Sequence, residues 1–229
     1  MYFFGKKFMN LDDENKDQSH ERQIDWSGIL DQYEVPTVFK DELLRPYFEQ
    51  GDFVEPILDV GCGRGYFSNL LLKRGYRVFG IDLNSDLQSS ENFDFQKRDF
   101  ITFETDQKFN TILLVNVLTT APPADRLKIL KKIKEIKSES GVAYVVNTNA
   151  DLFGNELDSE TLTIRKGERD TYRLKVKLVN GECIEFDDYV IVPEEMEEMC
   201  KEVGLEIVER KDLKSQHQDK PIYQVYVLR

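Results

Sequence analysis

The chain has 229 residues, 40% of them hydrophobic, which suffices for the core of one α/β domain. Its 31 basic and 43 acidic residues give a formal net charge of −12, an average field that repels polyanions and disfavours a nucleic acid partner. The sequence has no apolar run of about 18 residues, so we expect no membrane-spanning helix.

The N-terminal region differs in composition from the rest of the chain. Residues 9–25 are rich in Asp, Glu, Asn and Gln, which predicts a lightly packed arm. Apolar anchors return at Trp26 and Tyr33, and the apolar spacing that follows predicts a helix ending near Gly51. The expected divisions are an N-terminal arm or helical cap, residues 1–34, and a single domain, residues 35–229.

A glycine-rich turn follows the first predicted strand. The apolar run Ile57–Val60 leads into three glycines at alternate positions, and a helix opens almost at once; the glycines are Gly61, Gly63 and Gly65. Glycines at such a turn let the backbone bend tightly and let a ligand lie directly against it. The second predicted strand, 78–81, finishes at Asp82. An acid about 20 residues beyond the turn suits the ribose hydroxyls of a nucleotide-like ligand.

The order of residues in the glycine turn distinguishes two classes of ligand. A dinucleotide fingerprint has a small third residue, where this chain has the bulky Tyr66. The pattern Asp59-x-Gly61-x-Gly63-x-Gly65 instead resembles the first motif of the class I S-adenosylmethionine-dependent methyltransferases. The later motifs follow in order and extend the resemblance over about residues 35–229: Asp82, Asp99-Phe100 after a third strand at 93–97, and a fourth strand, 109–116, ending in Asn116. The alternatives are an ordinary βαβ turn without a cofactor and a nicotinamide-dependent oxidoreductase, which Tyr66 disfavours.

The remaining elements alternate between helix and strand, which predicts a parallel sheet flanked by helices. The elements are a helix after Pro122, a strand at 142–146, a helix from Pro193 to Gly204, and strands at 205–208 and 222–228. The first of these helices should direct Leu127, Leu130 and Ile133 inward. The resemblance implies a seven-stranded, mostly parallel sheet in the order 3-2-1-4-5-7-6, with the last strand antiparallel and helices on both faces.

The segment from about 150 to 190 departs from this alternation and is predicted to be a β-hairpin insertion after the fifth strand. A three-residue loop with a left-handed Gly181 keeps one side of the hairpin apolar, because it sets Val176 against Ile184 and Leu174 against Phe186. Insertions at this place commonly cover the acceptor site in the resembled family, and the resemblance implies that role here. The alternative is a partner-binding or homodimer surface.

The resemblance also implies S-adenosylmethionine as the cofactor, with S-adenosylhomocysteine as the product. Asp82 would accept hydrogen bonds from both ribose hydroxyls, with Leu83 packed on the adenine. Asp99 would accept from the adenine amino group, with Phe100 beside the ring, while Asp59 would organise the glycine loop. The full cofactor-binding set that the resemblance implies is Asp59, Gly61, Cys62, Gly63, Gly65, Asp82, Leu83, Asp99, Phe100, Asn116 and Val117.

A general base is harder to assign. Position 116 holds Asn, where some members of the resembled family carry an acid, and the Asn/Asp-Pro-Pro-aromatic motif of base and glutamine methylation is absent. Polar residues near the ends of the fourth and fifth strands and before the last strand could meet an acceptor, and each could equally be a capping or turn residue. The candidates are Asn116, Asn147, Asn149, Asp151 and His217. Proximity without a dedicated base is the alternative.

Cysteine and histidine usage bounds the remaining chemistry. Three widely spaced cysteines, an odd number, predict reduced thiols and a cytoplasmic location. No His/Cys/carboxylate cluster has metal-ligand spacing, so we expect no metal. The leading hypothesis is methyl transfer to a small-molecule acceptor by in-line displacement. The alternatives are a protein or RNA methyltransferase, the latter disfavoured by the charge, and a non-catalytic S-adenosylmethionine-binding scaffold or regulator.

Overall fold

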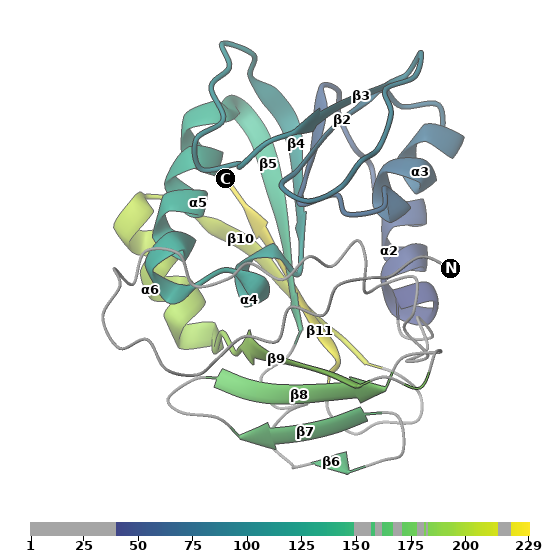
Figure 1. Ribbon diagram of the computed structural model, residues 1–229. Coiled ribbons are helices and arrows are strands. Elements are labelled where there is room, and N and C mark those ends of the chain that lie inside the picture. Colours follow the sequence, from purple (N-terminus) through teal and green to yellow (C-terminus); the bar gives the residue numbers. More distant parts are fainter. Residues whose placement is uncertain are drawn as a thin grey trace, which may run out of the picture.

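A seven-stranded sheet forms the centre of the molecule (Figure 1). Its order is β3-β2-β1-β4-β5-β11-β10, in which β1 to β5 pair in parallel and β11 is antiparallel to both of its neighbours. The strands are β1 (Ile57–Val60), β2 (Val78–Asp82), β3 (Phe93–Lys97), β4 (Phe109–Val115), β5 (Lys137–Thr148), β10 (Ile207–Leu213) and β11 (Tyr223–Leu228). The predicted strand order is therefore confirmed.

The computed structural model describes residues 40–148, 157–158, 162–166, 171–177, 181, 183–214 and 221–229. The predicted arm, residues 1–34 with Trp26 and Tyr33, lies outside these ranges. The boundary between arm and domain therefore stays a prediction. No helix in the described ranges is long and apolar enough to cross a bilayer.

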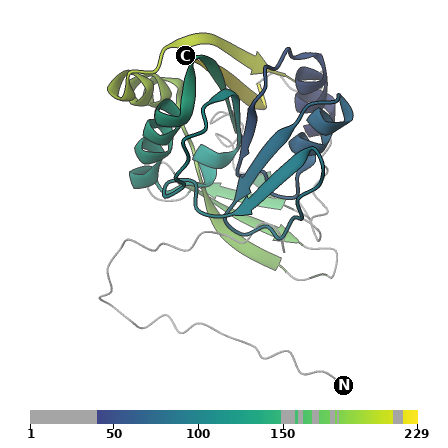
Figure 2. The ribbon, with the colours of Figure 1, turned by 90° about the horizontal axis from the view of Figure 1, so that it is seen from above.

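Helices cover both faces of the sheet (Figure 2). They are a π-helical turn, η2 (Lys40–Leu44), which continues into α2 (Arg45–Gln50), followed by α3 (Tyr66–Lys73), α4 (Val117–Thr120), α5 (Pro123–Ile136) and α6 (Pro193–Val203). The hydrophobic core is accordingly split into two clusters. One packs α2 and α3 on one face, with Phe48 and Leu71 among its members, and the other packs α4, α5 and α6 on the opposite face around Leu118, Leu130 and Met196.

The inward face of α5 differs from its prediction. Leu130 and Ile133 are fully buried as predicted, but Leu127 is only half-buried, and Arg126 takes an inward position beside Ile129. The spacing i, i+3, i+4, i+7 from Arg126 through Ile133 places these side chains on one stripe. The predicted inward position of Leu127 is therefore wrong by one residue, because the charged side chain of Arg126 occupies the core position at this end of the helix.

A second, four-stranded antiparallel sheet is inserted between β5 and α6, in the order β6-β7-β8-β9. Its strands are β6 (Leu157–Asp158), β7 (Leu162–Lys166), β8 (Thr171–Lys177) and β9 (Cys183–Tyr189). The predicted hairpin register is confirmed: Leu174 pairs with Phe186, Val176 pairs with Ile184, and Gly181 has a φ of 82°. The strands β6 and β7, which add to this hairpin, were not predicted.

Two further boundaries are corrected by the structure. The sixth strand of the main sheet, β10, begins at Ile207 and ends at Leu213, instead of spanning 205–208. The fifth, β5, begins at Lys137 instead of Val142 and ends at Thr148. The α6 helix ends at Gly204, which has a φ of 75°, as a left-handed helix terminus requires.

We expect the central sheet to dominate the free energy of unfolding. Val145→Ala, at a fully buried position of β5, should lower it by about 2 to 3 kcal/mol, because apolar contact is lost and a cavity remains. Val54→Ala, the same change at a side chain that is 61% exposed, should alter it by less than about 0.5 kcal/mol. Urea unfolding of both variants measures the difference, and similar values for the two would contradict the placement of the core.

Candidate active site

The glycine loop lies where β1 ends and α3 begins. Gly61, Gly63 and Gly65 have φ values of 61°, 54° and 73°, a region that side chains rarely adopt. A Cβ on Gly61 would stand 2.7 Å from Cγ2 of Val117, whereas a Cβ on Gly63 would meet no atom within 4 Å. The loop is therefore packed against α4 at its first glycine and open at its second, which leaves the backbone accessible to a ligand.

The carboxylate of Asp82 joins this loop to the segment that follows β2. Its Oδ2 accepts a hydrogen bond from the backbone N–H of Gly63 at 2.9 Å. Its Oδ1 accepts from the N–H groups of Asn84 and Ser85 at 2.8 and 2.9 Å. A carboxylate has about four acceptor positions, so these bonds leave about one for a ligand. The structure thus gives Asp82 a structural role that the sequence analysis did not include.

Ser85 is a site residue that the sequence analysis missed. Ser85 is 2% exposed, and its hydroxyl donates to the carbonyl oxygen of Gly63, so Gly63 is held at its carbonyl as well as at its N–H. A signal for it exists in the sequence, because an aspartate followed two and three residues later by Asn84 and Ser85 is typical of a turn closed by the Asp side chain.

Asp59 is a buried anchor of the glycine loop. It is 2% exposed, and its Oδ2 accepts a hydrogen bond of 2.6 Å from the hydroxyl of Ser68 in α3. This bond ties β1 to the helix that follows the loop, which is consistent with the expected organising role. Cys62 is also buried, and burial, followed by the charges of Asp59 and Asp82, raises the pKa of its thiol. A thiol with a raised pKa is a poor nucleophile, so a packing role for Cys62 is favoured.

The predicted adenine contacts lie around the ends of β2 and β3. The side chain of Leu83 is 38% exposed, while Phe100 is 8% exposed and packs in the core cluster of the α4–α6 face. The Oδ1 of Asp99 accepts a hydrogen bond from the N–H of Ile101 at 2.8 Å. Leu83 thus lies at the surface, whereas Phe100 is committed largely to the core.

The end of β4 meets the end of β5 beside the glycine loop. Asn116 has a left-handed φ of 57°, and its N–H donates to the carbonyl of Val146 at 2.8 Å. Its side-chain oxygen accepts from the hydroxyl of Thr148 at 3.2 Å. This sharp turn starts α4 at Val117, the residue that packs on Gly61. The structure therefore brings Val117, and Asn116 before it, to the glycine loop.

The catalytic candidates fall into two groups. Asn147 lies in β5 next to Val146, is fully buried, and its amide has no hydrogen-bond partner. It therefore shares the strand ends with Asn116. Asn149, Asp151 and His217 lie outside the described residues, so their roles stay predictions.

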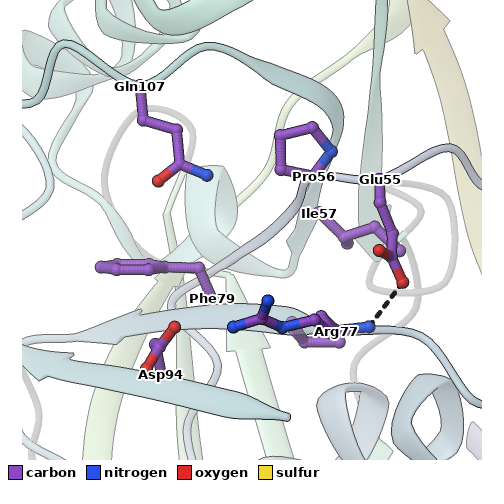
Figure 3. A pocket seen from close by; sticks show the side chains of 8 residues that line it. Glu55, Pro56, Ile57, Arg77, Phe79, Asp94 and Gln107 are labelled. Carbon is purple, nitrogen blue, oxygen red and sulfur yellow. Dashed lines mark hydrogen bonds between the residues drawn. The ribbon is translucent and has the colours of Figure 1, made fainter.

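Two surface pockets lie away from these residues. One, of about 340 Å³, opens at the amino ends of β1 and β2, the opposite edge of the sheet from the glycine loop (Figure 3). Its charged lining includes Glu55, whose carboxylate accepts from the N–H of Arg77 at 2.7 Å, and Asp94. The other, of about 440 Å³, lies between α2 and the β5–β11–β10 side of the sheet, with Tyr47 and Tyr144 in its lining. Neither contains a motif residue.

Comparison with known families agrees with this arrangement. A family model described as a methyltransferase domain matches residues 16–210 of this chain. The chain belongs to that family, and the predicted membership of the class I S-adenosylmethionine-dependent methyltransferases is confirmed.

Several proteins of known structure or curated sequence are similar to it. A ubiquinone biosynthesis O-methyltransferase of Actinobacillus pleuropneumoniae serotype 7 (strain AP76) is 26% identical over 161 residues, which cover 62% of this chain and 68% of that protein. The glycopeptide N-methyltransferase MtfA in complex with (S)-adenosyl-L-methionine matches with a TM-score of 0.63 and 12% identity, over 81% of this chain and 85% of that chain. An S-adenosylmethionine-dependent methyltransferase from Clostridium acetobutylicum ATCC 824 matches with a TM-score of 0.59 and 16% identity, over 93% of each chain. The two structural likenesses show the fold.

We expect Gly61 to be intolerant of a side chain for two separable reasons. Gly61→Ala should lower the free energy of unfolding by about 1 to 2 kcal/mol for the left-handed φ and by about 1 to 3 kcal/mol more for the contact with Val117. In a Val117→Ala background the second part should vanish. A double-mutant cycle by urea unfolding checks this, and an equal cost of Gly61→Ala in both backgrounds would exclude the close approach.

Proposed function

We propose that this chain binds S-adenosylmethionine against the glycine loop and transfers its methyl group to a small-molecule acceptor. The observation that carries the proposal is the loop itself, which is left-handed at each glycine, open at Gly63, and fixed to the acid at the end of β2. Open α/β sheets bind ligands outside the carboxyl ends of their strands, and the motif residues gather there.

The residues at this edge fit the parts of the cofactor. The free space beside Gly63 suits the methionyl chain, and the remaining acceptor position of Asp82 suits a ribose hydroxyl. The exposed side chain of Leu83 offers an apolar surface to the adenine, and the second oxygen of Asp99 can accept from its amino group. Phe100 would contribute only the edge that its core packing leaves open.

When bound, the cofactor supplies an electrophilic methyl group on a sulfonium with an excellent leaving group. The chain's task is then alignment, because an in-line displacement needs the acceptor atom held on the axis behind the methyl group. Asn116, Val117 and Asn147, at the ends of β4 and β5, lie where the acceptor would be held. An acceptor that is nucleophilic at neutral pH would need positioning more than a base.

A small acceptor is supported by the inserted sheet and by the relatives. The β6–β9 sheet lies across the end of the main sheet at which β4 and β5 finish, and β9 contacts α4 (Figure 1). A large substrate would have to pass this sheet to reach the strand ends. The curated relative is named as an O-methyltransferase of ubiquinone biosynthesis, which favours an oxygen as the methylated atom. The free thiols Cys62, Cys183 and Cys200 support a reducing compartment such as the cytoplasm.

The cofactor assignment predicts a specific loss of affinity. Asp82→Ala should weaken S-adenosylmethionine binding by about one to two powers of ten, because it removes a charged acceptor and loosens the Gly63 loop. Asp106→Ala, an exposed aspartate in the loop that leads into β4 at the opposite edge, is the matched control and should bind normally. Calorimetry measures both, with melting temperatures to verify folding. Unchanged binding by a folded Asp82→Ala variant would overturn the assignment.

The proposal of a small-molecule acceptor predicts which fraction of a cell lysate receives the methyl group. The full chain, incubated with methyl-labelled S-adenosylmethionine and fractions of a cell lysate, should transfer label to the small-molecule fraction, and Asp82→Ala should transfer much less. Label recovered in the protein or RNA fraction would show a macromolecular acceptor instead. Binding of the cofactor without transfer to any fraction would favour the scaffold alternative.

A further inference from the structure

Two side chains at the carboxyl edge of the sheet are buried without enough hydrogen-bond partners. Among the residues that the structure describes, the buried side-chain polar atoms that lack a partner are Nε and Nη2 of Arg126 and the two amide atoms of Asn147. Such groups are few in native proteins because each one forfeits its interaction with water, so each calls for an explanation.

Arg126 is held rigidly in the first turn of α5. It is 2% exposed, and its Nη1 donates to Oε1 of Glu195 in α6 at 2.5 Å. Its Cζ lies 5.2 Å from the centre of the Tyr189 ring at the end of β9. Three elements therefore fix the guanidinium: its own helix, the helix beside it, and the inserted sheet.

The two free nitrogens lie on one edge of the guanidinium. Nε and Nη2 are neighbours on the planar group and present two nearly parallel N–H bonds, while Nη1, on the other side, is occupied by Glu195. This edge matches the two oxygens of a carboxylate, which accept such a pair of bonds together. A lysine at this position would offer a single charge without that geometry.

Asn147 places a second polar group on the same side of the sheet. Side chains alternate along a strand, so Asn147 faces the α4–α6 side together with Val145, a member of that core cluster. Its partner across the strands, Gln224, accepts from Tyr226 and donates to Asp212, which leaves the Asn147 amide unpaired. The amide can both donate to and accept from a ligand.

Arg126 and Asn147 therefore both lie toward the carboxyl edge of the sheet, Arg126 in a helix and Asn147 in a strand. Arg126 precedes the buried Ile129 and Leu130 by one turn, toward the helix start that follows α4, and Asn147 is near the last residue of β5. Tyr189, at the end of β9, brings the inserted sheet to the Arg126 guanidinium. We take this end of the sheet, where β4 also finishes, as the acceptor side of the proposed site.

We propose that the free edge of Arg126 binds a carboxylate of the methyl acceptor and that Asn147 makes a second polar contact to the same molecule. The inference rests on the proposed function and adds the substrate class: a small acid with an apolar body beside its carboxylate. Leu118 and Ile191 are fully buried members of the core cluster on this face and would supply the apolar surroundings. Arg126 determines specificity and takes no part in the chemical step.

A purely structural role makes a different prediction. If Arg126 served only to join α5 to α6 through Glu195, its replacement would change the melting temperature but not the preference among ligands. A carboxylate and its uncharged amide have nearly the same shape, so their relative affinity isolates the guanidinium contact. Benzoate with benzamide, and 3-phenylpropanoate with 3-phenylpropanamide, are suitable pairs.

The test is calorimetric titration of the full chain with these pairs, with and without S-adenosylhomocysteine. Each acid should bind about ten- to a hundredfold more tightly than its amide, since a hydrogen bond to a charged group is worth that much. Arg126→Lys should reduce this preference to about threefold or less while S-adenosylhomocysteine binds as before. Asn147→Ala should weaken acid and amide alike.

A second variant guards against misfolding. Arg126→Met combined with Glu195→Gln removes both members of the ion pair, so no charge is left buried alone, and it should also abolish the preference. Equal binding of acid and amide by the wild type, no binding of either, or a preference that survives both variants would overturn the inference. Failure of S-adenosylhomocysteine to bind would instead count against the proposed function, so the two failures are distinguishable.

Discussion

The carboxylate of Asp82 is the contact on which the conformation of the glycine loop depends. One oxygen accepts from the N–H of Gly63, and the other accepts from the N–H groups of Asn84 and Ser85. A single side chain therefore fixes both the glycine loop after β1 and the turn after β2. Ser85 closes the arrangement by donating to the Gly63 carbonyl. Because bonds to a charged acceptor are about twice as strong as neutral ones, the loop is preorganised before any ligand arrives.

The sheet order then determines what surrounds this loop. The strand order reverses between β1 and β4: β1, β2 and β3 lie on one side of this point, and β4, β5, β11 and β10 lie on the other. The acids Asp59, Asp82 and Asp99 come from the first group, while Asn116 and Asn147 come from the second. The carboxyl edge therefore carries carboxylates on one side and amide groups on the other. Val117, packed on Gly61, is where the two sides touch.

The sequence predicted the main sheet well because its signals are local. Glycines with positive φ, acids at strand ends and alternating apolar runs are written within a few residues, and the hairpin register followed from keeping apolar residues paired. Contacts between distant elements were not predictable in this way. Ser85 reaches back to Gly63 over 22 positions, and the burial of Arg126 requires Glu195, 69 residues later.

Arg126 shows most clearly which contacts a local sequence pattern does not predict. An arginine in the first turn of a helix normally lies on the solvent-exposed face. The inward positions of α5 were accordingly predicted to hold apolar residues only. Its spacing with Ile129, Leu130 and Ile133 was visible, but whether a charge at such a position is tolerated depends on a partner in another element. The strands β6 and β7 raise the same difficulty, since a short strand is defined by the neighbour that pairs with it.

The position of the inserted sheet along the chain has an evolutionary consequence. The residues assigned to the methyl donor all precede Leu118, whereas β6 to β9 occupy one continuous stretch between β5 and α6. Such a stretch can be lengthened, shortened or exchanged between homologous genes without disturbing the loop that Asp82 secures. Chimeras joined at Thr148 and Pro193 would therefore exchange the inserted sheet and leave Arg126 and Asn147 with the recipient chain.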